Sequence, residues 1–111
     1  MGAFDFAIKK LQGGEKAVIK PRGRSMRGKV EDGDVVQLEP CSEAGLSVGD
    51  VVLVKVKGNV YLHLIKAVRQ GNKVKYQIGN NVGGINGWVS INAIYGKATK
   101  IERPINYGKN D

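Results

Sequence analysis

The sequence predicts a mainly β protein with one short helix near its N-terminal end. Two observations support this fold class: short β-branched runs recur along the chain between Gly, Asp, Asn and Pro residues, and only the first dozen residues show helical spacing. A chain of 111 residues fits one small core. We therefore expect a helix and Gly-Gly turn over 1–14, a β domain over 15–102 and a flexible tail over 103–111.

The expected elements follow the apolar pattern along the chain. The helix is expected over residues 3–11, where apolar side chains recur every three to four positions. Strands are expected at 17–19, 35–38, 51–56, from 60 onward, at 73–78 and from 93 to 98. Gly58-Asn59 and Gln70-Gly71-Asn72 are expected to provide the positive φ angles of two tight hairpins, which would make the strands of 51–78 consecutive and antiparallel. Residues 79–87, rich in Gly and Asn, are expected to form an irregular loop.

Composition narrows the function classes. Cys41 is the single cysteine, so we expect no internal disulfide, no zinc site and no redox chemistry, and we predict neither a metal nor another cofactor. The chain has no apolar run near the roughly 20 residues that cross a bilayer, and residues 1–12 lack the apolar centre of a secretory signal. We therefore expect a cytoplasmic protein without a membrane partner. The net charge of +8 favours an acidic partner. The basic residues are scattered along the sequence rather than clustered in one tract, so binding to nucleic acid stays an open alternative.

Ser25 and His63 form the candidate catalytic pair. A serine hydroxyl is a poor nucleophile at neutral pH unless a base lies within hydrogen-bond reach. His63 is the only histidine in the chain, so it is the only histidine base that Ser25 could use. Two plainer readings stay open: His63 as a satisfied core residue on an apolar strand, and Ser25 as a turn residue that bonds nearby backbone groups.

Five segments, in order, resemble one family of serine peptidases. Ser25-Met26-Arg27-Gly28-Lys29-Val30-Glu31-Asp32-Gly33-Asp34 resembles the Ser-Met-x-Pro signature, ending in Gly-Asp, of type I signal peptidases and of the peptidase domain of LexA-like repressors. The other four are Gly49-Asp50-Val51-Val52, Tyr61-Leu62-His63-Leu64-Ile65, Gly79-Asn80-Asn81 and Ile94-Tyr95-Gly96-Lys97-Ala98. The resemblance spans about residues 15–102.

The resemblance implies a coiled antiparallel β-ribbon or partial barrel that carries a Ser-His dyad. Ser25 would be the nucleophile, and His63 would replace the more common lysine base, as in the histidine-type members. Asn80 would orient the imidazole. The oxyanion and substrate-binding segment would be Gly23, Arg24, Ser25 and Met26. The substrate would be an extended peptide of a partner protein, bound as an added strand, and a homodimer could form through the terminal strands at 94–102.

The sequence also departs from the family pattern. Gly28 stands where the family has proline, which loosens the turn behind Ser25. Asn80 stands where histidine-type members have aspartate, and an amide stabilises imidazolium less than a carboxylate does. With only 24 residues before Ser25, we expect cleavage in trans rather than self-cleavage. The alternatives are a weak or inactive member of the same fold that binds protein or nucleic acid, and an unrelated OB-like or SH3-like RNA-binding barrel.

Overall fold

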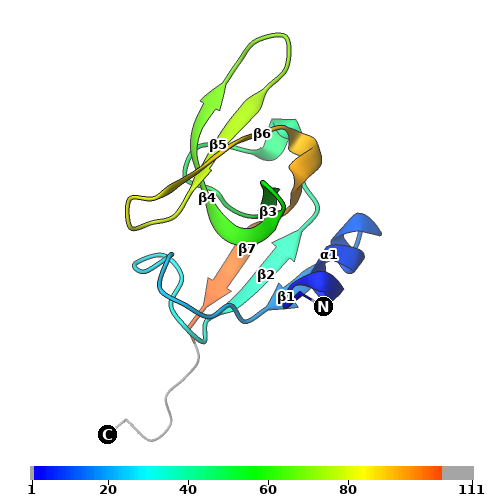
Figure 1. Cartoon of the computed structure of the whole chain (residues 1–111). Coiled ribbons are helices and arrows are strands. Elements are labelled where there is room, and N and C mark those ends of the chain that lie inside the picture. The colour runs from blue at the N-terminus through cyan, green and yellow to red at the C-terminus, as the bar shows by residue number, and fades with distance from the viewer. Residues whose placement is uncertain (1, 104–111) are drawn as a thin grey trace, which may run out of the picture.

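Residues 2–103 are described by the computed structural model, and they form one antiparallel seven-stranded sheet with a short helix beside it (Figure 1). The sheet order is β1-β2-β7-β3-β4-β5-β6. The elements are α1 Asp5–Gln12, β1 Ala17–Ile19, β2 Val35–Glu39, β3 Val51–Val56, β4 Asn59–Arg69, β5 Lys75–Gly79, β6 Ile85–Val89 and β7 Ile94–Glu102, with short 3-10 helices at Glu43–Gly45 and Ile91–Ala93. The mainly β prediction with one N-terminal helix is confirmed.

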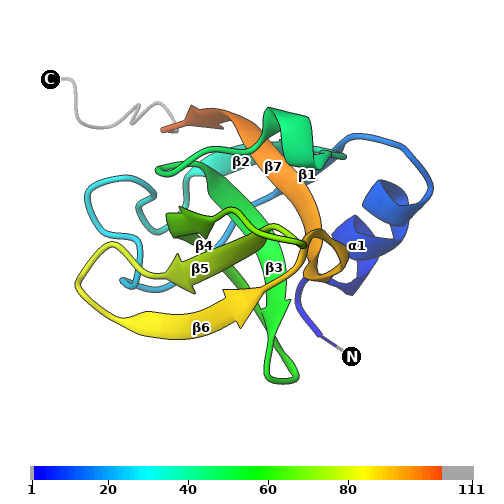
Figure 2. The same ribbon diagram turned by 90° about the horizontal axis from the view of Figure 1, so that it is seen from above.

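Helix α1 begins and ends slightly later than the spacing predicts. Its buried residues, Ala7 and Leu11, lie four positions apart on one face and pack into the core beside β1 and β2. The helix ends at Gly13, whose N–H donates to the carbonyls of Lys9 and Lys10. Seen from above, α1 lies beside the β1 and β2 end of the sheet (Figure 2). In the described part of the chain, α1 and the two 3-10 helices are each too short to span a bilayer.

β3 runs through the middle of the sheet and is buried on both faces. Val51 and Leu53 belong to a core cluster that includes α1, β1 and β2, whereas Val52, Val54 and Val56 belong to a second cluster with β5. A strand covered on both faces has no need of alternating polar residues, which explains its nearly continuous apolar sequence. β7 lies between β2 and β3, and it therefore links the β1–β2 pair to strands β3–β6 in one sheet.

The two predicted hairpins exist, but their turns differ from the prediction. The β3–β4 turn takes positive φ at Lys57 (50°) and Gly58 (87°), not at Gly58 and Asn59. Asn59 already pairs with Val56, so it belongs to β4. Two central residues with positive φ match the twist of the flanking strands. In the longer β4–β5 turn, Gly71 does not adopt positive φ, and β5 begins only at Lys75.

β6 corrects the prediction that residues 79–87 form an irregular loop throughout. Gly79 is the last residue of β5 and Ile85–Val89 pairs with that strand as β6, so only residues 80–84 form a loop. Asn86-Gly87 has the composition of a turn, but here Gly87 lies opposite Ile78 with a φ of 147°, a conformation that glycine adopts without strain. Pairing with β5 therefore overrides the local turn tendency.

Each of the two Gly-Asp pairs closes a turn and precedes a strand. Asp34 N–H donates to the Glu31 carbonyl at 3.0 Å, and the Glu31 N–H donates to Asp34 Oδ2 at 2.8 Å. Asp50 makes the same pair of bonds with Ser47, at 3.1 and 2.9 Å. The preceding glycine has positive φ in both turns. One local device therefore launches both β2 and β3.

Arg103, the last described residue and the first of the predicted tail, forms an ion pair with Asp34. Arg103 Nε donates to Asp34 Oδ1 at 3.2 Å, which ties the residue after β7 to the turn before β2. Arg103 is thus not part of a free tail, and the rest of the predicted tail, 104–111, lies outside the described residues.

Candidate active site

His63 is held in the middle of β4 with 5% of its surface exposed. On one face of the strand, Leu62 and Leu64 enter the cluster that includes α1, and on the other Tyr61 and Ile65 pack in the second cluster. The Tyr61 ring stacks on the imidazole with centroids 4.7 Å apart and planes 18° apart. Sheet register and stacking therefore fix the position of the imidazole ring.

Ser25 lies in an exposed loop between β1 and β2, and a distant loop holds it in place. Asn81 N–H donates to the Ser25 carbonyl at 2.8 Å, and Asn81 Nδ2 donates to the Arg27 carbonyl at 2.7 Å. Both bonds clamp the short turn around the serine. The loop between β5 and β6 therefore sets the position of the Ser25 backbone.

Two carboxylates brace the same loop from within. Asp32 Oδ1 accepts a hydrogen bond from Gly23 N–H at 2.9 Å, and Glu31 Oε2 accepts one from Gly28 N–H at 2.7 Å. Gly28 has a φ of 96°, which proline cannot adopt because its ring fixes φ near −65°. A proline at position 28 would therefore not fit the turn that this loop adopts.

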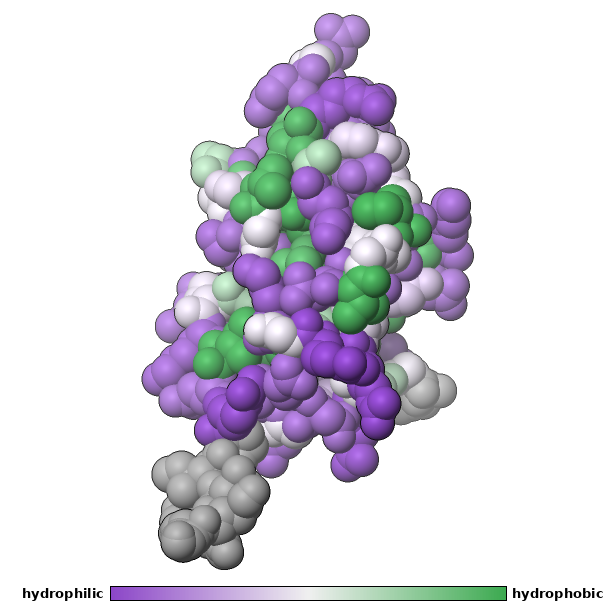
Figure 3. All heavy atoms as spheres, turned by 90° about the vertical axis from the view of Figure 1, so that its left-hand side faces the viewer, coloured by the Kyte–Doolittle hydropathy of each residue, from purple (hydrophilic) through white to green (hydrophobic). Residues whose placement is uncertain are grey.

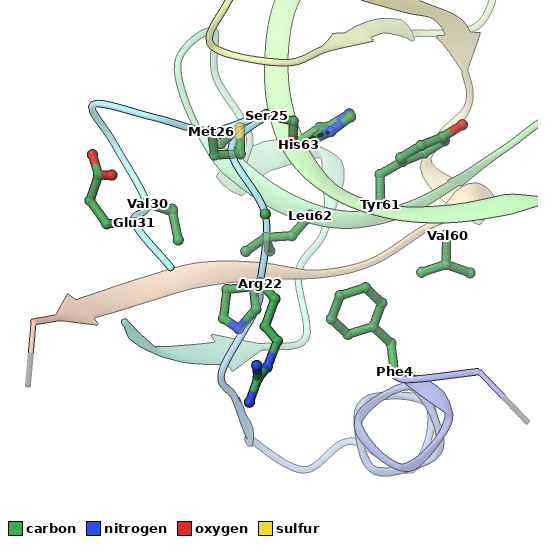
Figure 4. Close-up of a pocket in the computed structure, with 12 residues that line it drawn as sticks. Phe4, Arg22, Ser25, Met26, Val30, Glu31, Val60, Tyr61, Leu62 and His63 are labelled. Atoms are coloured by element: carbon green, nitrogen blue, oxygen red, sulfur yellow. Dashed lines mark hydrogen bonds between the residues drawn. The ribbon is translucent and has the colours of Figure 1, made fainter. Parts of the chain in front are cut away.

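The structure brings Ser25 and His63 together. Ser25 Oγ lies 3.1 Å from His63 Nε2, and the two side chains lie side by side above the pocket in Figure 4. On the other side of the ring, His63 Nδ1 lies 2.6 Å from Asn86 Oδ1. An amide oxygen only accepts hydrogen bonds, so Nδ1 carries the proton and Nε2 presents a lone pair to the serine hydroxyl. This tautomer is the one that general-base catalysis requires.

Asn86 reaches the imidazole because of a β-bulge. The register between β5 and β6 shifts so that Gly87 lies opposite Ile78 and Ile85 lies opposite Gly79, which leaves Asn86 as the extra residue. A bulge redirects the side chain of the extra residue. The orienting group thus comes from a strand that the sequence pattern did not reveal; its only signal was an Asn-Gly pair downstream of Gly79.

Asn80, expected to orient the imidazole, has another role in the structure. Its Oδ1 accepts hydrogen bonds from Val82 N–H at 3.0 Å and Gly84 N–H at 2.7 Å, and its own N–H donates to the Gly84 carbonyl. Asn80 thereby closes the loop that carries Asn81. It supports Ser25 indirectly, and Asn86 takes the position beside His63.

Burial sets the protonation of His63. Desolvation lowers the pKa of the imidazole below its ordinary value of 6.5, because burial disfavours the charged ring, and the hydrogen bond to Asn86 opposes this effect in part. The ring is therefore neutral at pH 7 and free to accept a proton.

A pocket of about 190 Å³ opens beside the dyad. Its apolar walls come from Phe4, Met26, Val30, Val60 and Leu62, and its polar groups are Ser25, His63, Arg22 and Glu31. Gly23 and Met26, two residues of the predicted substrate-binding segment, line it, and Met26 is also a core residue. Arg24 does not line it; its carbonyl accepts a hydrogen bond from Arg27 N–H.

The first half of β4 borders this pocket with an open edge. Residues 59–63 pair with β3, whereas β5 pairs with β4 only from Leu64 onward. The backbone of this half-strand therefore has a ladder partner on one side only within the described sheet. An extended chain laid along it would run directly toward His63 and Ser25.

A scan against protein-family models and a search of curated proteins found no match for this chain. Within residues 2–103, no group of three or more His, Cys, Asp or Glu side chains is arranged to hold a metal ion.

Proposed function

We propose that this protein is a serine endopeptidase-like hydrolase that cleaves an extended peptide of a partner protein. The observation that carries the proposal is the 3.1 Å contact between Ser25 Oγ and the proton-accepting Nε2 of His63. The adjoining apolar pocket and the open edge of β4 support a peptide substrate, and the coiled antiparallel sheet is compatible with a LexA-like or signal-peptidase-like fold.

In the proposed reaction, His63 Nε2 takes the Ser25 proton as Oγ attacks the carbonyl carbon of the scissile bond. The tetrahedral intermediate collapses with cleavage of the C–N bond, and His63 gives the proton to the departing amine. Water, deprotonated by His63, then attacks the Ser25 ester, releases the acid and restores the free hydroxyl. Asn86 holds the imidazole in the required tautomer throughout.

The oxyanion would be stabilised by backbone donors at Ser25. Neither the Ser25 nor the Met26 N–H donates a hydrogen bond elsewhere in the described chain. Preorganised N–H groups of this kind, aimed at the developing negative charge, supply a large share of catalysis in acyl transfer. The neutral Asn86 provides no charge to stabilise imidazolium, so we expect slow turnover.

Labelling with a fluorophosphonate at pH 8 tests the proposal. The reagent forms a covalent ester only with an activated serine, so we expect mass spectrometry to locate the label on Ser25. Ser42, Ser47 and Ser90 are internal controls, because Ser25 is the serine that hydrogen-bonds to His63 in the described chain. Folded protein that stays unlabelled at Ser25 would overturn the enzymatic proposal and favour a non-catalytic binding protein.

A further inference from the structure

A second hollow adjoins the pocket beside Ser25, along the N-terminal helix. This second hollow, of about 550 Å³, lies between α1 and β1, and its apolar walls include Phe6, Ala7 and Val18. Phe4 and Arg22 line both hollows, which therefore lie next to each other. Both are drawn across the pocket from Ser25 and His63 in Figure 4. Together the two hollows form a groove, here called the α1 groove, that leads from the dyad to the helix.

The far end of the α1 groove exposes apolar side chains. Phe6 is 76% exposed and Val18 is 59% exposed, although each has an apolar neighbour in the same hollow. β1 is the edge strand of the sheet, so its outer backbone has no strand partner within the described residues. An exposed apolar patch beside an open strand edge is typical of a peptide-binding surface.

Two cations, Lys20 and Arg22, line the α1 groove, and they belong to a basic loop. The loop from β1 to the Gly-Asp turn carries five cations, and none forms an ion pair within residues 2–103: Lys20, Arg22, Arg24, Arg27 and Lys29. The two nearest acids, Glu31 and Asp32, already accept hydrogen bonds from the backbone. At the helix end, Lys10 Nζ lies 5.6 Å from the centroid of the Phe6 ring. The α1 groove is therefore mainly apolar, its lining cations are Lys20 and Arg22, and its one lining acid, Glu31, already accepts a hydrogen bond from Gly28 N–H.

Resting on the proposed function, we propose that the α1 groove selects an acidic, extended peptide substrate. One apolar side chain fills the pocket beside Ser25, an acidic side chain pairs with Arg22, and a further apolar side chain covers Phe6 and Val18. The observations favour a peptide over nucleic acid, because the hollows have apolar walls and side-chain dimensions rather than a row of exposed aromatic rings for bases. α1 then acts as a specificity element.

Peptide binding to full-length Ser25→Ala tests the charge preference without catalysis. We would measure fluorescence anisotropy at low salt with two sets of labelled peptides, each of which carries one leucine. The glutamate set has glutamates two to four positions from the leucine on either side, and the lysine set has lysines at the same positions. We expect the glutamate set to bind roughly tenfold or more tightly than the lysine set. Arg22→Glu should remove that preference, whereas the matched charge reversal Lys73→Glu, on the exposed β4–β5 turn, should keep it.

Apolar substitutions test the contribution of the helix end. Phe6→Ser and Val18→Ser should each weaken binding of the glutamate peptides roughly threefold to tenfold. Val48→Ser is the control, since Val48 is 61% exposed but lies outside the groove. Equal losses in all three variants, equal binding of the two peptide sets, or an equal effect of Lys73→Glu would overturn the inference.

Competition distinguishes the other macromolecular partner. Two competitors of equal charge are compared, a single-stranded oligonucleotide and an unlabelled glutamate peptide. If the oligonucleotide displaces the labelled glutamate peptides at the lower concentration, nucleic acid rather than peptide is the ligand of the groove. The outcomes also separate the two proposals. If fluorophosphonate labels Ser25 but no peptide binds selectively, the groove inference fails alone. If the glutamate set binds selectively but Ser25 is never labelled, the catalytic proposal fails alone.

Discussion

The two members of the dyad are held in place by different kinds of structure. His63 lies on a regular strand, buried between two core clusters and stacked on Tyr61. Ser25 lies on an exposed loop whose shape depends on single hydrogen bonds, from Asn81 and between loop residues. The base is therefore positioned by packing, and the nucleophile by polar contacts that water can compete for.

This difference teaches where variation is tolerated. Packing is cooperative, so a change near His63 is expected to alter stability together with the site. Contacts on an exposed loop contribute little to global stability, so a change there is expected to alter the reaction alone.

In Figure 3, one face of the protein shows hydrophobic side chains dispersed among hydrophilic ones rather than one continuous apolar face.

The sharpest contrast is between Ser25→Ala and His63→Ala. Both should reduce peptide hydrolysis to background, and the double variant should be no worse. In a fully active serine peptidase this loss is roughly 10⁶-fold, and here we expect a smaller loss because Asn86 provides no charge to stabilise imidazolium. The two single variants should differ in their free energy of unfolding. Ser25→Ala should change the free energy of unfolding by less than about 0.5 kcal/mol, and His63→Ala should lower it by about 2–3 kcal/mol because a buried ring is lost. Denaturant titration measures both, and equal destabilisation would contradict the comparison.

Replacing Asn86 tests how the sheet orients His63, because the Asn86 amide accepts the hydrogen bond from the imidazole. Asn86→Asp should raise kcat by up to about 10⁴-fold, the converse of the loss seen when a triad aspartate becomes asparagine in another protease. Asn80→Asp is the matched control and should not raise it, since the Asn80 side chain bonds the backbone of its own loop. A gain in Asn80→Asp without one in Asn86→Asp would restore the role that the sequence suggested for Asn80.

The two Gly-Asp turns give a test at the base of the serine loop. Asp34 is 1% exposed and pairs with Arg103, whereas Asp50 is more exposed and lies 3.4 Å from Lys97. Asp34→Asn should lower the free energy of unfolding by about 2–3 kcal/mol, and Asp50→Asn by about 1 kcal/mol or less. Chemical denaturation at pH 7 compares them, and an equal loss would show that burial of the carboxylate adds nothing.

The same substitution should lose its effect in acid. The hydrogen bond from Arg103 is the largest cause that lowers the pKa of Asp34 below its ordinary value of 3.8. A carboxyl with a lowered pKa in the folded state stabilises the fold above its unfolded pKa and loses that contribution as pH falls through the folded value. The gap between wild type and Asp34→Asn should therefore be constant above about pH 5 and narrow below pH 4.

The smallest expected effect is a shift in pH dependence. Burial lowers the pKa of His63 below 6.5, so the labelling rate of Ser25 should be flat near neutral pH and fall about tenfold per pH unit only below that lowered pKa. Asn86→Asp should move the break upward, because a carboxylate favours imidazolium. A break above 6.5 in the wild type would show that His63 is more solvated than its place in β4 implies.

Much of this architecture could be predicted because local sequence specifies it. The β-branched runs of β2 and β3 and the two Gly-Asp turns carry their own signals, and the single histidine left one partner for Ser25. Asn86 could not be found in that way. Its position depends on the β5–β6 register and on the bulge at Asn86 itself, which are set by long-range pairing rather than by neighbouring residues. The Lys57-Gly58 turn was misassigned because only pairing shows where β4 begins.

The half-open strand at residues 59–63 also bears on how copies of the protein behave in concentrated solution. An unsatisfied strand edge is a template for a strand of another molecule, and hence a site where aggregation can begin. The net charge of +8 keeps copies apart at low ionic strength. Salt shortens the reach of that repulsion from about 10 Å at 0.1 M to about 3 Å at 1 M. Solubility should therefore fall as salt rises, and an acidic peptide seated on the edge should protect it.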